Sequence, residues 1–182
     1  MSNKNSSILI GRKAEVELLE DTFQAKSGKI IALYGRRRIG KSYLIKHFIK
    51  DKFALHFEGL EKGNSKAQLT HFYNTLLKQH SDPLLNRPFI SWDEAFNFIT
   101  ERIVKPRKTK TIIFLDELQW MAIGREGLIS LIKFFWDNYW LNDKVMLILC
   151  GSISSFMINK VVKSKALYGR ISSELCSKAS VQ

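Results

Sequence analysis

LYGRRRIGKSYLIKHF, residues 33–48, places a loop with two glycines, a lysine and a serine between an apolar run and an amphipathic segment. Within it, residues 35–42 (GRRRIGKS) match the pattern G-x-x-x-x-G-K-[ST]. The pattern needs a strand before it and a helix after it, and the sequence predicts both, a buried strand over residues 29–34 and a helix from Ser42. Glycines let such a loop curl so that its backbone N–H groups point inward, and the helix N-terminus adds a positive dipole end. The stretch therefore predicts a loop that binds phosphate groups.

This loop, the Walker A pattern, divides the work between side chains and backbone. Lys41 is predicted to place its ammonium on the β- and γ-phosphates of a nucleoside triphosphate, and the Ser42 hydroxyl to bind Mg²⁺. The backbone is predicted to bind phosphate along the rest of the loop, which comprises Gly35, Arg36, Arg37, Arg38, Ile39 and Gly40. The arginine side chains are expected to point away from the phosphates. Their roles stay open: supporting the triphosphate, contacting a neighbouring subunit, holding DNA, or forming a solvated charge cluster.

A nucleotide site of this kind also needs a carboxylate from a second strand, the Walker B position. In residues 111–117 (TIIFLDE) an apolar run leads to Asp116, which is placed to hold Mg²⁺ against Ser42. Glu117 follows directly and is placed to polarise a water for attack on the γ-phosphate. An acidic pair at a strand end also occurs where a helix merely begins, because Asp and Glu favour first turns. Together with the lysine loop, the pair favours hydrolysis over simple phosphate binding.

A third apolar strand ends in polar residues. Residues 145–157 (VMLILCGSISSFM) place Ser152 directly after the predicted strand and Ser155 one helical turn further on. A side chain at this position would lie between the two nucleotide-binding loops, where it could contact the γ-phosphate or the attacking water. Ser152 is the first choice and Ser155 the second. The alternative is a serine that caps the next helix, and one hydroxyl can serve both purposes.

Strand and helix patterns alternate along the rest of the chain. Strands are predicted at residues 53–57, 111–115 and 145–150, and helices at residues 64–80, from 91 onward, and at 127–140. Ser91 and Glu94 form a capping-box pattern at the start of the second of these helices. The strands lack polar alternation, as strands covered on both faces do. The pattern indicates an α/β domain with a parallel sheet and helices on both faces.

Length, charge and cysteine usage narrow the class of protein. The 182 residues suffice for one domain, and a net charge of +12 invites a polyanionic partner, either nucleic acid or a bound nucleotide. No apolar stretch approaches the ~20 residues of a membrane helix, and the N-terminus lacks a signal-like core. The two cysteines, Cys150 and Cys176, fit a reducing compartment, so we expect a cytoplasmic protein without a membrane partner. The four histidines lie too far apart in the sequence to suggest a set of metal ligands.

The three strand ends and their order resemble the AAA+-related family of archaeal-type P-loop ATPases, which also has bacterial members. The resembling segments are residues 10–19, 33–45, 112–120, 149–157 and 167–170. The resemblance implies one P-loop ATPase domain over residues 8–171, with an AAA+-like parallel sheet. It also implies ATP, rather than GTP, as the nucleotide.

The resemblance further implies roles for residues that spacing alone does not single out. Gly11 and Arg12 match a short segment that lies near the adenine in such ATPases. Ser152 matches the sensor position on the fourth strand. Arg170 matches a recurrent arginine that senses or completes a nucleotide site, including that of a neighbouring copy in a homo-oligomer.

The sequence departs from the family pattern at its end. Family members typically continue into a fifth strand, a small helical lid and often a DNA-binding or nuclease-like domain. Residues 172–182 contain no apolar run fit for a central strand, so the sequence predicts a disordered tail there, with the fifth strand and the lid missing. The strand over residues 29–34 would then be an unpaired edge, and loss of the lid would reduce turnover even where binding survives.

The leading hypothesis is an ATP-binding domain of a Mg²⁺-dependent ATPase that converts ATP to ADP and phosphate to drive a conformational switch. The alternative is a nucleotide-gated module that binds DNA or another protein with little or no turnover, for which the net charge of +12 would be the working feature. A small-molecule kinase shares the lysine loop but needs an acceptor pocket, for which the sequence has no signature.

Overall fold

A computed structural model describes residues 12–122 and 127–176 of the chain. Its centre is a five-stranded, fully parallel sheet in the order β2-β3-β4-β1-β5. The strands are β1 (Lys29–Tyr34), β2 (Ala54–Glu58), β3 (Ile112–Asp116), β4 (Met146–Gly151) and β5 (Ile171–Cys176). The predicted parallel α/β architecture is therefore confirmed.

The strand register brings the candidate site residues together at the carboxyl ends of the strands. In β1, Tyr34 lies opposite Gly151 of β4, and in β2, Glu58 lies opposite Asp116 of β3. Because all strands run in the same direction, their carboxyl ends lie together on one side of the sheet, and open α/β sheets bind ligands at these ends. The loops after β1, β3 and β4 are those that carry the predicted site.

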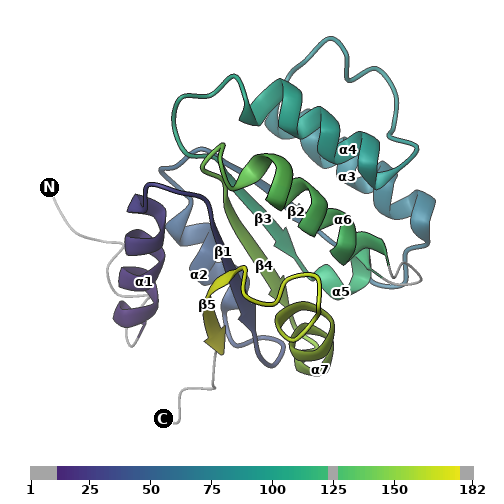
Figure 1. Ribbon diagram of the computed structural model, residues 1–182. Coiled ribbons are helices and arrows are strands. Elements are labelled where there is room, and N and C mark those ends of the chain that lie inside the picture. Colours follow the sequence, from purple (N-terminus) through teal and green to yellow (C-terminus); the bar gives the residue numbers. More distant parts are fainter. Residues whose placement is uncertain (1–11, 123–126, 177–182) are drawn as a thin grey trace, which may run out of the picture.

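Helices cover both faces of the sheet (Figure 1). The α-helices are α1 (Lys13–Gln24), α2 (Lys41–Phe48), α3 (Ser65–Gln79), α4 (Trp92–Ile99), α5 (Leu118–Met121), α6 (Gly127–Phe135) and α7 (Ser154–Phe156). Three of them continue into π-helical turns, η1 (Thr100–Val104), η2 (Trp136–Trp140) and η3 (Met157–Val162). Helices α1 and α2 lie on one face of the sheet, and α3, α4 and α6 on the other. None of the helices in the described ranges has the length and apolar character needed to cross a membrane.

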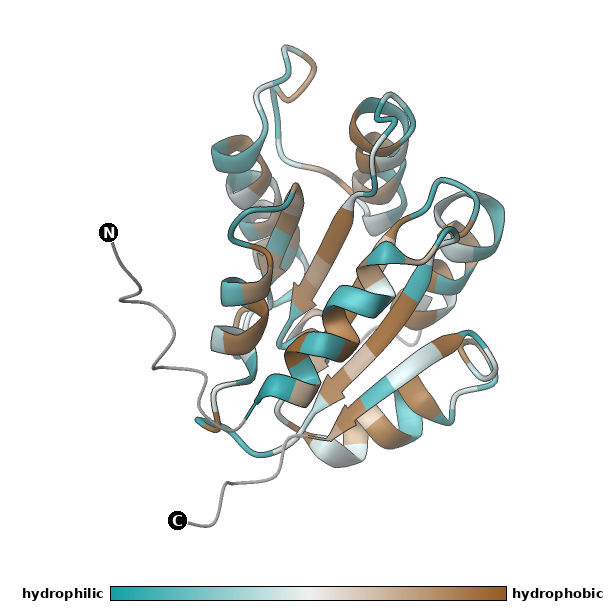
Figure 2. Ribbon diagram, turned by 90° about the vertical axis from the view of Figure 1, so that its left-hand side faces the viewer, coloured by the Kyte–Doolittle hydropathy of each residue, from teal (hydrophilic) through white to brown (hydrophobic). Residues whose placement is uncertain are grey.

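Two hydrophobic cores, one on each face, explain why the central strands β1, β3 and β4 carry apolar residues toward both faces. Phe114 and Ile148 face the core under α1 and α2, while their neighbours Leu115 and Leu149 face the core under α3, α4 and α6. Figure 2 shows largely hydrophobic strands between helices along which hydrophilic and hydrophobic residues alternate. Successive residues of a strand face opposite sides of the sheet, so a strand buried on both sides needs apolar residues at consecutive positions. The sequence shows this pattern in the central strands.

Side chains satisfy the backbone at two helix starts and along one sheet edge. Asn64 caps α3 by accepting from the Ala67 N–H at 2.9 Å. Ser91 caps α4 by accepting from the Glu94 N–H at 3.1 Å, as predicted. The carboxylate of Glu94 accepts from the N–H of the residue before Ser91, so only half of the predicted capping box forms. On the outer edge of β2, the Gln79 side chain bonds both the N–H and the C=O of His56 at 2.8 Å, which blocks further strand pairing there.

The prediction of a missing fifth strand was wrong. Strand β5 pairs in parallel with β1 from Ile30↔Ile171 to Tyr34↔Cys176, so β1 has a partner on both sides. The sequence ISSELC shows no apolar run because this is an edge strand, in which only Leu175 is buried against the core. The residues of the expected tail up to Cys176 therefore belong to the sheet, and residues 177–182 lie outside the described part.

Candidate functional site

The loop after β1 adopts the backbone that its glycines permit. Gly35 has φ 144° and Gly40, the N-cap of α2, has φ 78°. Arg38 also has a positive φ, 63°, a conformation that costs a non-glycine residue about 1–3 kcal/mol. A loop that keeps such strain and leads directly into a helix N-terminus has the form of a phosphate-binding loop.

Lys41 lies inside this loop. Its side chain is buried, with 5% of the residue exposed, and its ammonium donates to the carbonyl oxygens of Gly35 at 2.8 Å and Arg36 at 2.7 Å. Within the described part of the chain, the charge is therefore held against the loop by neutral carbonyl acceptors. Phosphate oxygens would replace these carbonyls with stronger, charge-assisted partners.

Arg12 holds the same loop from the side of α1. Its guanidinium donates to the carbonyl oxygen of Ile39 and, at 3.3 Å, to that of Gly40, and it pairs with Glu15 at 3.4 Å. Arg12 thus fastens the turn that enters α2. Its proximity to adenine stays a prediction, and Gly11 lies outside the described residues.

Asp116 is a buried, ionised carboxylate at the end of β3. Only 2% of the residue is exposed, and its Oδ1 accepts from the Glu117 N–H at 2.9 Å. Burial raises the pKa of this carboxyl, but interactions with His56, Ser42 and Cys150 outweigh it and lower the pKa below its ordinary value. Burial, with Asp116 nearby, raises the pKa of the Cys150 thiol, which stays protonated. Ser42, the other predicted Mg²⁺ ligand, is thus among the groups that stabilise the Asp116 carboxylate, and their shared role as Mg²⁺ ligands stays a prediction.

Glu117 and Ser152 meet, although they follow different strands. The Ser152 hydroxyl donates to Glu117 Oε2 at 2.6 Å, so the first-choice serine lies beside the predicted base. Glu117 has φ 49° and precedes α5, which turns its side chain toward β4. Ser155, the second choice, is exposed in α7.

Gln119 completes this contact, and sequence reasoning assigned it no role. It is 3% exposed, and its side-chain amide donates to Glu117 Oε2 and, at 3.1 Å, to Ser152 Oγ. A Cβ on Gly151 would lie 2.7 Å from Met157 and 2.8 Å from Gln119 Oε1, so a glycine is needed for the amide to come this close. The spacing Glu117-x-Gln119 was the available signal, because the turn after Glu117 brings both side chains to one side.

The side chains of Arg36, Arg37 and Arg38 are exposed, and their expected orientation away from bound phosphates stays a prediction. Arg37 pairs with Glu61 at 2.9 Å and lies over the Trp120 ring at 5.8 Å. These groups line a hollow of about 390 Å³ that also reaches Glu117 and Glu58. The hollow gives solvent a route to the carboxylates at the strand ends.

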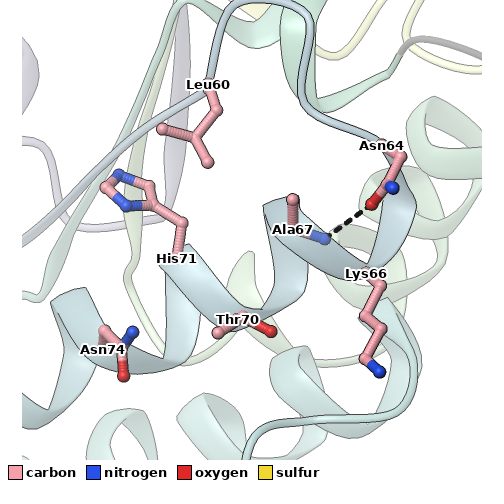
Figure 3. A pocket seen from close by; sticks show the side chains of 7 residues that line it. All are labelled: Leu60, Asn64, Lys66, Ala67, Thr70, His71 and Asn74. Carbon is pink, nitrogen blue, oxygen red and sulfur yellow. Dashed lines mark hydrogen bonds between the residues drawn. The ribbon is translucent and has the colours of Figure 1, made fainter.

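A second hollow, of about 470 Å³, opens beside the first over the start of α3 (Figure 3). Leu60 and His71 line both hollows, and the remaining lining residues are Asn64, Lys66, Ala67, Thr70 and Asn74. Figure 3 shows Leu60 on the segment that precedes α3, across the hollow from the residues carried by α3 and its N-cap Asn64. No carboxylate lines this hollow, so the groups suited to hydrolysis belong to the first.

Arg170 lies apart from all of these residues. It directly precedes β5 and therefore lies at the amino-terminal edge of the sheet, opposite the phosphate-binding loop. Its guanidinium binds Asp137 at 2.6 and 2.8 Å, and the pKa of Asp137 is lowered chiefly by this bond. A hollow of about 440 Å³ at this edge is lined by Arg170, Asp137 and Lys29, among others.

Known sequences resemble this chain over most of its length. The family model described as an ATPase domain predominantly from Archaea matches residues 9–177. The uncharacterized protein MJECL04 of Methanocaldococcus jannaschii is 28% identical over 164 residues, covering 90% of this chain and 34% of that protein. The uncharacterized ATP-binding protein MJ0423 of the same organism is 44% identical over 45 residues, covering 25% of this chain and 76% of that protein. The chain thus spans about a third of the first of these relatives.

Solved structures share the fold. The Walker-type ATPase PABY2304 of Pyrococcus abyssi superposes with a TM-score of 0.70 at 20% identity, over 91% of this chain and 52% of that chain. Cdc6p from Pyrobaculum aerophilum gives 0.59 at 14% identity, over 92% and 46%. Drosophila ORC bound to DNA gives 0.53 at 18% identity, over 80% and 40%. At these identities the likeness concerns the fold, and it confirms the AAA+-like arrangement.

Proposed function

The chain belongs to the family of ATPase domains found predominantly in Archaea, and from this premise we propose that it hydrolyses ATP to ADP and phosphate with Mg²⁺. The observation that supports this most is the meeting of three groups at one sheet edge: a buried lysine inside a glycine-bordered loop, a buried ionised aspartate, and a glutamate held by a serine.

The residues divide into binding and catalytic roles. The backbone of the loop and Lys41 bind the phosphates, and Ser42 and Asp116 bind Mg²⁺, whose charge offsets that of the β- and γ-phosphates. Glu117 orients the attacking water. Because Ser152 and Gln119 both donate to Oε2 of Glu117, the other oxygen, Oε1, is the one offered to the water.

The same contacts suit a conformational switch. A γ-phosphate in the loop would compete with the loop carbonyls for Lys41 and with Glu117 for the Ser152 hydroxyl. Hydrolysis would restore the bonds described above. The loop after β1 and the helix α7 after Ser152 would then respond to the state of the nucleotide.

Arg170 cannot serve the loop of its own chain from the opposite sheet edge. We assign it to the nucleotide site of a neighbouring copy, which makes turnover depend on a homo-oligomer. The test mixes Lys41→Ala with Arg170→Ala: regained hydrolysis supports a shared site, and two variants that stay inactive together contradict it.

Binding and turnover are tested separately. Titration calorimetry of Mg²⁺–ATP, Mg²⁺–GTP and Mg²⁺–ADP into the purified chain should show binding that Lys41→Ala weakens about 10- to 100-fold, the value of a charge-assisted hydrogen bond or two. Lys46→Ala, on the exposed side of the same helix, is the matched control. Glu117→Gln should keep binding and lose turnover by about 10²–10⁴-fold. A folded protein with no affinity for any nucleotide contradicts the proposal.

A second candidate, a nucleotide-gated DNA-binding module, is favoured by the three exposed arginines of the loop and the net charge of +12. One structural neighbour is a complex bound to DNA. Affinity for duplex DNA should then fall steeply with salt, and Arg36→Ala should reduce the slope by about one charge. Retention that does not depend on salt argues against this candidate.

A further inference from the structure

Three residues beside the phosphate-binding loop form a group that the sequence did not suggest. In the described part of the chain, His56, Glu58 and Asp116 each offer one potential metal ligand, and these atoms lie within 4.8 Å of one another. His56 and Glu58 alternate along β2, so both face the same side, and Glu58 lies opposite Asp116 of β3. The group is therefore built by strand pairing rather than by spacing along the chain.

The His56 ring is held firmly, yet its outer nitrogen has no hydrogen bond. The ring stacks on Phe114 with centroids 4.5 Å apart and an angle of 14°, and Gln79 fixes its backbone. Its Nε2 is buried without a hydrogen-bond partner among the described residues. Buried polar atoms normally have partners, so an unpaired ring nitrogen in a fixed orientation calls for one.

The distance to the nearest carboxylate matches shared coordination better than a hydrogen bond. His56 Nε2 lies 3.9 Å from Asp116 Oδ2, which is too far for a hydrogen bond. Two ligands that are each about 2.1 Å from one ion lie about 3–4 Å apart. The other Asp116 oxygen, Oδ1, is taken by the Glu117 N–H, so Oδ2 is the one turned toward His56.

We propose that His56, Glu58 and Asp116 bind a divalent transition-metal ion. The imidazole decides the class of ion, because Mg²⁺ and Ca²⁺ prefer oxygen ligands, whereas Mn²⁺, Fe²⁺, Co²⁺ and Zn²⁺ accept nitrogen. Two carboxylates supply the negative charge that a dication needs. Glu58 is exposed and borders the hollow that reaches Glu117, so an ion can enter from solvent.

This site shares Asp116 with the Mg²⁺ position of the proposed function. The link between the two metal positions rests on the proposed function, whereas the binding of an ion by the three residues does not. An ion bound by all three residues would lie at the edge of the phosphate site and keep positions open for water or a phosphate oxygen. The preference of the ATPase for its cation would then depend on a histidine of β2, outside the phosphate-binding loop.

Mn²⁺ binding by the full chain without nucleotide tests the proposal. The electron paramagnetic resonance signal of free Mn²⁺ should fall until about one equivalent is bound, and Mg²⁺ should compete only at much higher concentration. His56→Phe keeps the ring stacked on Phe114 and removes both nitrogens. It should weaken Mn²⁺ binding at least about tenfold, the lower end of the loss seen when even an outer partner of a metal site is removed. Glu58→Gln, at an exposed position, should do the same.

A matched control and separate readouts make the result decisive. His47→Phe replaces a histidine that also stacks on an aromatic ring, Tyr43, but lies outside the group, and it should leave Mn²⁺ binding unchanged. Equal Mn²⁺ affinity in the wild type, His56→Phe and Glu58→Gln overturns the proposal. The proposal is also overturned if the wild type binds no free Mn²⁺ while His56→Phe loses affinity for Mg²⁺–ATP. In that case His56 acts as an ion-pair partner of Asp116 and not as a metal ligand. If the chain binds Mg²⁺–ATP but no free Mn²⁺, the metal site is refuted and the ATPase proposal stands. If the chain binds free Mn²⁺ but no Mg²⁺–ATP, the metal site stands and the ATPase proposal is refuted.

Discussion

Replacing Ser152 with alanine tests the contact on which the catalytic assignment depends. The hydroxyl donates to Glu117 Oε2 at 2.6 Å, and Ser152→Ala removes this bond without adding bulk. A hydrogen bond to a charged group contributes about 1.5–3 kcal/mol. Because Ser152 is half-exposed and Gln119 still donates to the same oxygen, the lower end applies. We therefore expect a loss of about 1.5 kcal/mol in transition-state stabilisation, or about tenfold in kcat.

The assay is steady-state phosphate release at saturating Mg²⁺–ATP, with nucleotide affinity measured separately by calorimetry. The effect should fall on kcat, because the bond orients Glu117 and does not hold the loop. Ser155→Ala is the matched control, since Ser155 is an exposed serine three positions further on. A kcat for Ser152→Ala that stays within twofold of wild type, or that falls no further than that of Ser155→Ala, refutes the reasoning.

Three further predictions concern the scaffold of the site. Gly151→Ala should destabilise the fold by about 1–3 kcal/mol in urea unfolding, because the new Cβ would meet two buried side chains at 2.7 and 2.8 Å. Gly127→Ala, which meets nothing within 4 Å, should be close to neutral, and equal effects would contradict the packing argument. The pKa of Asp116 is lower in the folded state than its ordinary value of 3.8, so its ionisation stabilises the fold fully above that value and loses this effect as the pH falls through the folded pKa. The unfolding free energies of wild type and Asp116→Asn should therefore converge in acid, and a gap that does not change with pH would speak against it. Arg12→Ala should weaken Mg²⁺–ATP binding about tenfold by freeing two loop carbonyls, whereas Lys13→Ala, on an exposed neighbour, should not; equal affinities would remove Arg12 from the site.

The central strands and the residues at their ends could be predicted from the sequence. Strands covered on both faces must be apolar throughout, so residues 29–34, 111–115 and 145–150 could be recognised without any structure. Parallel strands bring their carboxyl ends together, so a lysine loop, an acidic pair and a serine after three such strands were expected to meet. Lys41, Asp116, Glu117 and Ser152 do lie at one edge.

What sequence reasoning missed depends on pairing between segments distant in the chain. Strand β5 is polar because an edge strand needs a backbone partner and only one buried face. The search for an apolar run, which recognises central strands, therefore missed it. His56 meets Asp116 only because β2 lies beside β3. The grip of Arg12 on the loop depends on how α1 packs against α2, a contact that no local pattern shows.

Arg170 and the phosphate-binding loop lie at opposite ends of the strands, and this separation limits what Arg170 can do. Strand β1 runs from Lys29, beside the hollow that contains Arg170, to Tyr34, beside the phosphate-binding loop. Six residues at about 3.3 Å each separate these ends by close to 20 Å, which is more than an arginine side chain can span. The bonds to Asp137 also hold the guanidinium at its own end of the strands. Any action of Arg170 on a phosphate would therefore require a second copy whose loop faces this end of the sheet, as the proposed shared site assumes.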